Sequence, residues 1–336
     1  MEFVLLVSFR DVQMKCSCLL FWMACGVMFS GCIVGQNPRI KVRDAVIPGR
    51  SPRVDVRGFV PAAYQEAVDV ALGKAGNNGR QLVKALSQVP ASQQEGMSFL
   101  IAHMPERDLQ TLSAKFLLDN VRLAYQALKE APWADAIPHE IFLNDILPYA
   151  SINERRDNWR AGFYREFMPA ASKHPTLQQA TLSLNHVVFE RLHVTYDGVR
   201  RPKPDQSPFE SMRAHFASCT GLSVLLTDVL RAVGIPARLA GIAMWADESG
   251  NHTWVEVWDG KWHHLGASES TALDQAWFTE KAGQTDASHH IYAVSFKKTG
   301  IFFPMRWAPE LRDVSAVDVT ANYQSGRSGS DALKKN

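Results

Sequence analysis

The hydrophobic and polar positions divide this chain of 336 residues into three regions with different patterns. An apolar run dominates the first 32 residues. From about residue 61 to residue 192 the pattern is mostly that of helices, interrupted by proline, glycine and capping residues. After residue 236, short runs of aromatic and β-branched residues are separated by turn residues, which is typical of strands. This order predicts a helical region followed by a region that contains a sheet.

The helical region contains several candidate helices, each begun or ended by a proline, a glycine or a capping residue. They span residues 61–75, 79–88, 90–103, 106–130, 138–148, 158–168 and 176–192. Polar residues crowd positions 142–160, which is typical either of a cleft wall or of helix caps and surface ion pairs. A loop rich in proline and glycine is predicted at residues 194–216.

One further helix is predicted directly after this loop. Apolar residues at three- and four-residue spacing form its buried stripe, namely Leu222, Leu225, Leu226, Val229, Leu230 and Val233. Gly234 ends the helix, and Pro236 prevents its continuation. Cys219 therefore lies in the first turn. Free N–H groups and the positive end of the helix dipole there lower the pKa of a thiol and favour the nucleophilic thiolate.

Strands are predicted after the cysteine helix. They span residues 237–246, 252–258 and 261–265. The second strand begins with His252, next to a turn, where its side chain can face a cleft. A cysteine nucleophile needs a base, and His252 is the best-placed candidate. The alternatives are that Cys219 is a small core hydrophobe and that His252 is an ordinary surface or hydrogen-bonded residue.

The overall composition is that of an ordinary globular protein, with 46% hydrophobic residues, 21% charged residues and a formal charge of +2. No basic face alternates with aromatic residues, so we expect no nucleic-acid partner. No pattern predicts a cofactor. The pairs His263-His264 and His289-His290 carry possible zinc ligands, but adjacent histidines on a strand point to opposite faces. We therefore predict no metal site.

The N-terminus has the features of an export signal. Lys15 supplies a positive flank, residues 19–29 form an apolar core too short to span a bilayer, and Cys32 follows small residues. The segment 29–32 resembles the lipobox of bacterial lipoproteins, which implies that Cys32 carries the lipid anchor in the bacterial cell envelope. The alternatives are a single membrane helix or an ordinary cleaved signal. Cys219 is the one cysteine after this segment.

The cysteine and histidine segments resemble the transglutaminase-like superfamily. The similar segments are residues 218–221, 230–238 and 252–258. This resemblance implies a papain-like core in which the cysteine is the acylated nucleophile and the histidine is its base. It also implies an aspartate on the next strand that orients the imidazole.

Other segments resemble branches of the same superfamily. Residues 262–269 and 317–323 are similar to segments of peptide N-glycanases, whose paired CxxC zinc motifs this sequence lacks. Residues 141–149 are similar to exported bacterial transglutaminase-like lipoproteins. These resemblances imply a peptide, protein or glycopeptide substrate.

The chain departs from the family pattern at one position of the site. Gly266 stands four residues after Trp262, where the aspartate is expected, and glycine cannot orient an imidazole. In a two-residue hairpin at positions 259–260, His252 faces Ala267, so Glu269 shares the histidine's face and Gly266 points to the other. We therefore predict that Glu269 orients His252, although a single bulge would reverse this parity.

The sequence thus predicts an α+β fold with a papain-like, transglutaminase-like core preceded by a helical region. The predicted parts are a lipoprotein signal peptide at 1–31, a flexible tether at 32–60, a helical region at 61–175, a transglutaminase-like domain at 176–323 and a disordered tail at 324–336. The expected activity is acyl transfer at an amide by Cys219, His252 and Glu269, with water as the favoured acceptor and an amine as the other. The alternative is a non-catalytic binding lipoprotein with a degenerate cleft.

Overall fold

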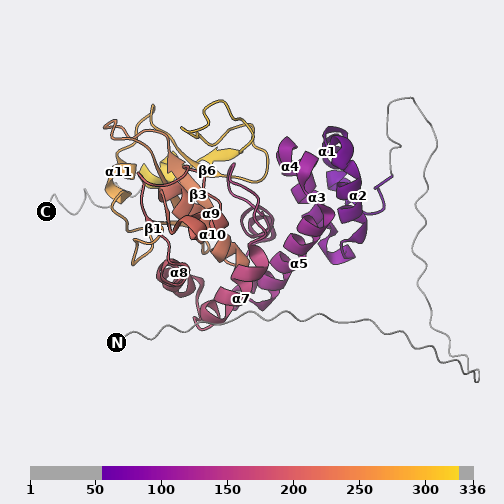
Figure 1. Cartoon of the computed structure of the whole chain (residues 1–336), viewed down its shortest axis with the longest axis horizontal. Helices are drawn as coiled ribbons and strands as arrows, with labels where there is room; N and C mark the ends of the chain where they lie inside the picture. The colour runs from indigo at the N-terminus through magenta and orange to yellow at the C-terminus, as the bar shows by residue number, and fades with distance from the viewer. Residues whose placement is uncertain (1–54, 325–336) are drawn as a thin grey trace, which may run out of the picture. The chain divides into compact units, whose positions relative to one another are not determined.

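The computed structural model describes residues 55–324, which belong to one compact unit (Figure 1). The predicted signal peptide, the acylated Cys32, most of the tether and the tail beyond residue 324 lie outside the described residues. Within the described part, no helix is both long and apolar enough to cross a bilayer. Helices come first in the chain and an antiparallel sheet follows, so the predicted α+β fold is confirmed. The proposed domain boundary near residue 175 stays a prediction.

The described chain before residue 193 is helical. Its α-helices are α1 (Gln65–Lys74), α2 (Gly79–Gln88), α3 (Gln94–His103), α4 (Glu106–Thr111), α5 (Ala114–Glu130), α6 (His139–Ile141), α7 (Arg160–Ala171) and α8 (Leu177–Leu192). A π-helical turn, Phe142–Ile146, continues α6. The predicted helix 106–130 is divided in two, because the extended Ser113 caps α5 by accepting a hydrogen bond from the Phe116 N–H.

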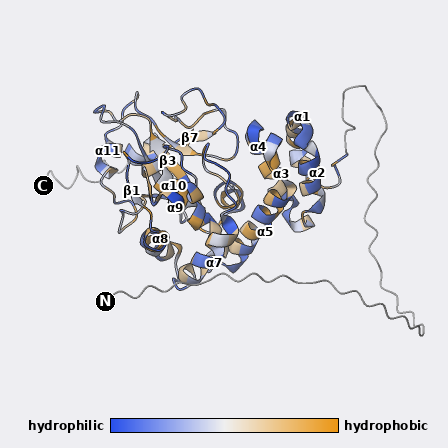
Figure 2. Cartoon of the chain, in the orientation of Figure 1, coloured by the Kyte–Doolittle hydropathy of each residue, from blue (hydrophilic) through white to orange (hydrophobic). Residues whose placement is uncertain are grey.

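Helix α5 illustrates how periodicity positions these elements. Leu117, Val121 and Ala124 are buried, while Lys115 and Arg122 on the same helix are exposed. Figure 2 shows hydrophobic and hydrophilic residues alternating along α5. The helix therefore packs one apolar face inward, as the three- and four-residue spacing predicts.

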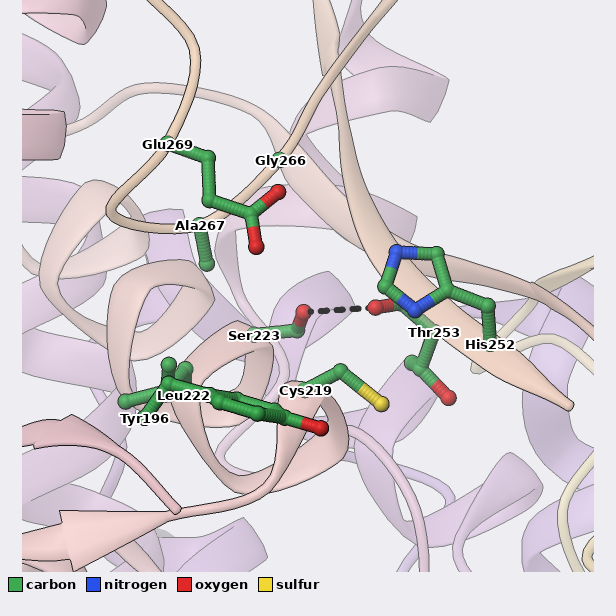
Figure 3. A pocket seen from close by; sticks show the side chains of 9 residues that line it. All are labelled: Tyr196, Cys219, Leu222, Ser223, His252, Thr253, Gly266, Ala267 and Glu269. Atoms are coloured by element: carbon green, nitrogen blue, oxygen red, sulfur yellow. Dashed lines mark hydrogen bonds between the residues drawn. The ribbon is translucent and has the colours of Figure 1, made fainter. Parts of the chain in front are cut away.

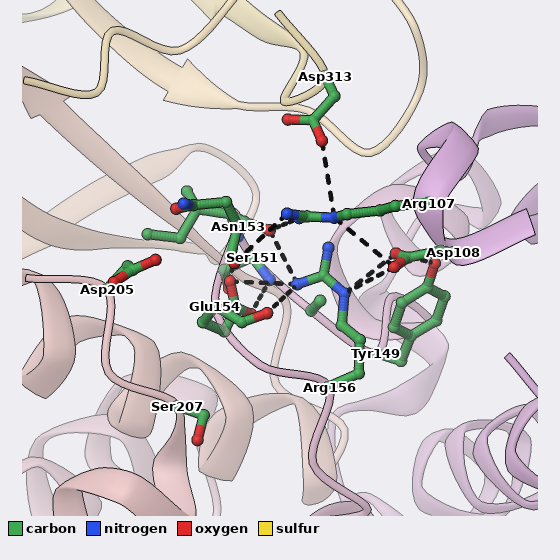
Figure 4. Close-up of polar contacts among 12 residues, drawn as sticks. Arg107, Asp108, Tyr149, Ser151, Asn153, Glu154, Arg156, Asp205, Ser207 and Asp313 are labelled. Atoms are coloured by element: carbon green, nitrogen blue, oxygen red, sulfur yellow. Dashed lines mark hydrogen bonds and ion pairs between the residues drawn. The ribbon is translucent and has the colours of Figure 1, made fainter. Parts of the chain in front are cut away.

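The polar residues that precede α7 form an internal network (Figure 4). Asp108 of α4 accepts hydrogen bonds from the Tyr149 hydroxyl at 2.8 Å and from Arg156 Nε at 3.0 Å. Arg107 Nε lies 3.6 Å from a carboxylate oxygen of Asp313, which belongs to the loop before the last strand. Ion pairs and hydrogen bonds thus explain much of the polar density noted in this stretch.

Two buried arginines join the helical region to the core, and we call them the arginine junction. Arg160 of α7 donates to the backbone carbonyls of residues 146, 147 and 148, to Asn120 Oδ1 and to the Arg231 carbonyl. Arg231 donates to the carbonyls of residues 145, 150 and 237. Each arginine is at most 2% exposed. Backbone oxygens therefore replace water around both guanidinium groups.

The C-terminal half contains the sheet and the cysteine helix. Its elements are β1 (Thr195–Tyr196), α9 (Pro208–Ala214), β2 (Phe216–Ala217), α10 (Cys219–Ala232), β3 (Ala237–Ile242), β4 (His252–Trp258), β5 (Trp262–Leu265), α11 (Thr279–Gly283), β6 (Ile291–Val294), β7 (Ala316–Asp318) and α12 (Thr320–Gln324). The strand order β5-β4-β3-β6-β7 is antiparallel throughout, and β1 and β2 form a separate parallel pair. Helix α10 packs against β3 and β4, and every residue from Thr220 to Ala232 is buried.

The predicted two-residue hairpin between β4 and β5 is wrong. Trp258 pairs with Trp262, so three residues form the loop, and Gly260 adopts the left-handed conformation with φ +78°. Glycine adopts this conformation without the strain that a side chain would add. The extra residue shifts the register by one, and in this register Gly266 falls on the face of His252.

Candidate active site

Cys219 lies at the first position of α10, as the sequence predicts. Strand β2 ends two residues earlier, and the extended Ser218 serves as N-cap. Cys219 is the free cysteine of the described residues and is partly exposed. A thiol at this position can meet a substrate while its backbone remains fixed by a fully buried helix.

The thiol does not have the lowered pKa that its position at a helix start suggests. Burial raises the pKa of Cys219 above its ordinary value. Hydrogen bonds from the Thr253 backbone and from Thr220, together with the positive charge of Arg201, oppose this increase without cancelling it. The prediction of a stable thiolate is therefore wrong for the substrate-free pocket, because loss of water outweighs the helix dipole.

His252 is the first residue of β4, and its ring is enclosed by aromatic side chains. The ring centroids of Trp277 and Phe278 lie 4.8 and 4.9 Å from that of His252, and Trp254 and Trp245 lie at 5.8 and 6.3 Å. Burial in these surroundings lowers the pKa of His252 to about 4. The Nε2 atom is buried without a hydrogen-bond partner. The imidazole is thus neutral near pH 7, since no charged group offsets its desolvation.

One small pocket contains both Cys219 and His252 (Figure 3). Its free volume is about 10 Å³, which is room for about one water molecule. Ser223 Oγ donates to the Thr253 carbonyl at 3.3 Å, which ties α10 to β4 beneath the pocket. Packing between the two elements therefore brings a helix start and a strand start together.

Glu269 also lines this pocket, but it does not bind His252 directly. Its Oε2 lies 2.7 Å from the position that a Cβ on Gly266 would occupy. The predicted hydrogen bond between Glu269 and the imidazole is absent at Nε2, which has no partner. Figure 3 shows the carboxylate beside Gly266, with the His252 ring to one side of both the carboxylate and the Cys219 sulfur. The glutamate thus occupies the space that a side chain at position 266 would fill.

The surroundings of Glu269 favour its protonated form more than water would. Burial of the carboxyl group raises its pKa, and a hydrogen bond from the Trp277 side chain partly opposes this. In an ion pair, a nearby cation would lower the pKa of the carboxyl group. No cation contributes to the pKa of Glu269. A positive charge on His252 would be the natural partner for this group.

Two aromatic residues of the site were not among the predicted catalytic residues. Tyr196 lines the pocket because β1 pairs with β2, which places Tyr196 opposite Ala217, just before Cys219. Trp277 packs on His252 although 25 residues separate them in sequence. Both side chains are exposed, at 62% and 59%. No local sequence pattern predicts that these two aromatic rings lie exposed beside the pocket.

The histidine pairs considered as zinc ligands make other contacts. His263 Nδ1 and His264 Nδ1 lie 2.7 and 3.3 Å from the two carboxylate oxygens of Asp274. His264 Nε2 is 2.8 Å from Thr279 Oγ1. Within residues 55–324, no group of three or more histidine, cysteine, aspartate or glutamate side chains is arranged to hold a metal ion.

Comparison with known proteins finds one family model that matches part of the chain. Residues 168–267 match the family model of the transglutaminase-like superfamily, so the resemblance predicted from the sequence is confirmed for this segment. The match includes Cys219, His252 and Gly266 and ends two residues before Glu269. It supports a cysteine-dependent enzyme at this coarse level.

One solved structure with a similar chain is that of a candidate cysteine protease from Cytophaga hutchinsonii. The two sequences are 16% identical, and the TM-score is 0.28. The alignment covers 48% of this chain and 58% of that chain. Among curated proteins, the comparison finds no match.

Proposed function

We propose that this chain, whose residues 168–267 match the transglutaminase-like superfamily, is an exported cysteine-dependent acyl-transfer enzyme. Its reaction is hydrolysis of an amide bond in a peptide, protein or glycopeptide. The observation that carries this proposal is the single pocket that holds Cys219 at a helix start and His252 at a strand start. A nucleophile and a base in one pocket are the two groups that covalent catalysis at a carbonyl requires.

The reaction begins from a neutral thiol and a neutral imidazole. Cys219 Sγ attacks the amide carbonyl while His252 accepts the thiol proton. Backbone N–H groups at the start of α10 are suited to stabilise the oxyanion. The imidazolium then gives its proton to the leaving amine, which leaves a thioester on Cys219. Water attacks the thioester with His252 as base, and the proton returns to the sulfur as the acid departs.

Glu269 is proposed as the residue that supports the imidazolium during these steps. His252 becomes charged in a pocket that favours its neutral form, so a carboxylate beside Nε2 lowers the energy of the charged state. A change of side-chain rotamer brings Glu269 from its place over Gly266 toward the ring. The glutamate would then orient and stabilise the imidazolium in place of the aspartate that is expected at position 266.

A second candidate function is binding without catalysis. The unpartnered Nε2 of His252 and the absence of a side chain at Gly266 favour it, because an unsupported imidazole is a weak base in a buried site. This protein would then hold a peptide or glycopeptide in the cleft and release it unchanged. The two functions differ in whether the protein converts a bound peptide to products.

The test is digestion of a peptide and glycopeptide library in water enriched in ¹⁸O, with mass detection of products. Hydrolysis incorporates the isotope into the new carboxylate, whereas transfer to an amine does not. Cys219→Ala should abolish product formation, a loss of at least about 10³-fold. Its melting temperature should stay close to that of the wild type, because alanine fits the same space. Retention of intact peptides by the wild-type protein, with no product, would favour the binding function.

Export and lipid anchoring are proposed from the sequence of the N-terminus. Gly31 and Cys32 close an apolar segment of signal length. In a bacterial host, the protein should incorporate labelled fatty acid and sediment with membranes, and Cys32→Ser should abolish both. An unmodified mature N-terminus at any other residue would contradict the lipoprotein proposal.

A further inference from the structure

The loop between β1 and α9 holds a cation that has no acidic partner. Arg200 of this loop pairs with Asp197, and Lys203 lies 3.9 Å from Asp205 and 3.0 Å from Glu210. Arg201 differs from both neighbours, since no carboxylate of the described residues lies within ion-pair distance of it. Its Nε atom is buried without any hydrogen-bond partner. A partly buried guanidinium in this state carries a desolvation cost that a bound anion would offset.

Arg201 lies beside the nucleophile. Its charge lowers the pKa of both the Cys219 thiol and the Tyr196 phenol, although burial dominates for each group. A Cβ on Gly198 would stand 2.8 Å from the Tyr196 hydroxyl and 3.5 Å from Arg201 Nη1. The Tyr196 hydroxyl and the Arg201 guanidinium therefore both lie next to Gly198. This position is at the edge of the pocket that Tyr196 and Cys219 line.

The absence of a side chain at Gly198 leaves room for the Tyr196 hydroxyl beside Arg201. A side chain at this position would displace the Tyr196 hydroxyl, because 2.8 Å is shorter than an ordinary contact of a Cβ atom. Figure 3 shows the Tyr196 hydroxyl near the Cys219 sulfur. Glu269 lines the same pocket, and its charge raises the pKa of the Tyr196 phenol while the charge of Arg201 lowers it.

We infer that Arg201 and the Tyr196 hydroxyl form a subsite for a carboxylate group that the substrate carries next to its scissile amide. The inference rests on the proposed function and names its substrate class, acidic peptides. The guanidinium donates hydrogen bonds to the carboxylate oxygens, and the tyrosine hydroxyl donates another. Either an acidic side chain or a free α-carboxylate has this chemistry.

Alkylation of Cys219 tests the subsite without any need for turnover. Iodoacetate and iodoacetamide are similar in size, and the first carries a carboxylate next to the reactive carbon. The full chain is treated with each reagent, and modification of the Cys219 peptide is followed by mass spectrometry. Arg201→Gln should lower the rate ratio of iodoacetate to iodoacetamide at least about tenfold, the loss expected for one charge-assisted hydrogen bond. Arg200→Gln is the matched control and should leave the ratio unchanged.

Two further results decide the inference. Arg201→Lys should restore part of the ratio, which shows that a change in folding does not explain the loss. An unchanged ratio in Arg201→Gln would overturn the subsite. Equal slowing of both reagents is one form of this outcome, in which Arg201 acts on the thiol alone.

Peptides identify the source of the carboxylate. Three otherwise identical sets carry an acidic side chain beside the amide, a free C-terminal carboxylate, or neither. Arg201→Gln should lower kcat/KM for one of the first two sets and leave the third unaffected. If no peptide is cleaved while iodoacetate selectivity depends on Arg201, the subsite stands and the proposed hydrolysis fails.

Discussion

Buried polar groups have hydrogen-bond partners in the arginine junction but lack them in and beside the Cys219 pocket. In the junction, Arg160 and Arg231 donate to backbone carbonyls and to Asn120. In and beside the pocket, Nε2 of His252 and Nε of Arg201 are buried without partners. Folding alone would favour partners for every such group. The contrast indicates that the junction serves stability and that the pocket keeps its polar groups free for a substrate.

One residue near the junction departs from this description. Asp228 of α10 is fully buried, and neither of its carboxyl oxygens has a hydrogen-bond partner. Burial raises its pKa well above the ordinary value, with Glu154 adding to the increase and Arg231 opposing it. Burial therefore favours the uncharged form of Asp228, and the structure offers no account of why a carboxyl group stands there.

The largest effect on stability is expected at the junction. Arg160→Met removes the donor to the carbonyls of residues 146–148 and 231 and leaves them buried without partners. We expect the free energy of unfolding to fall by about 3–5 kcal/mol, measured by denaturant titration. Arg165 lies on the same helix but is exposed, and Arg165→Met should change stability by less than about 0.5 kcal/mol. Equal effects of the two changes would contradict the assignment of the junction.

Acid should destabilise the pocket through His252. Burial lowers its pKa from 6.5 to about 4. Between about pH 4 and pH 6.5, His252 is therefore protonated in the unfolded chain and neutral in the folded chain. The stabilisation is complete above about pH 6.5 and is lost as the pH falls toward 4. From about pH 7 to about pH 4, the wild type should lose about 3 kcal/mol more than His252→Gln. Parallel stability curves for the two proteins would contradict a buried neutral imidazole.

The carboxylate beside Gly266 should matter for activity more than for stability. Glu269→Gln keeps the shape and removes the charge that supports the imidazolium, so kcat should fall about tenfold with little change in melting temperature. Gly266→Asp alone should be strained, because its Cβ would stand 2.7 Å from Glu269 Oε2. Combined with Glu269→Ala, it should recover part of the rate. A double variant no more active than Glu269→Ala would count against this role.

The smallest effect is expected at Asp228. Because burial favours the uncharged form of this carboxyl group, Asp228→Asn should change the free energy of unfolding by less than about 1 kcal/mol. Between the ordinary pKa of an aspartate and the raised pKa of Asp228 in the folded chain, the wild type should become less stable as the pH rises, because the unfolded chain loses a proton that the folded chain keeps. Asp228→Asn should lack this dependence. A loss as large as that of Arg160→Met would show that Asp228 is charged and paired.

Local sequence patterns determined the elements that carry the site. The apolar stripe after Cys219 and the stop at Gly234 sufficed to place the thiol at a helix start, because helix periodicity and capping act within a few residues. The aromatic and β-branched run in the same way predicted a strand that begins at His252. These signals, with the family resemblance, gave the fold class and the cysteine–histidine pair.

Tertiary structure decided the rest of the site. One extra residue in the loop after Trp258 reversed the predicted faces, because register depends on the turn and a side chain's face changes with every residue. Burial, which no local pattern measures, raised the pKa of Cys219 and lowered that of His252. Tyr196 reached the pocket because a parallel strand pair places it opposite Ala217, just before α10. Sequence thus determined which groups are available, and long-range packing determined their charge and their neighbours.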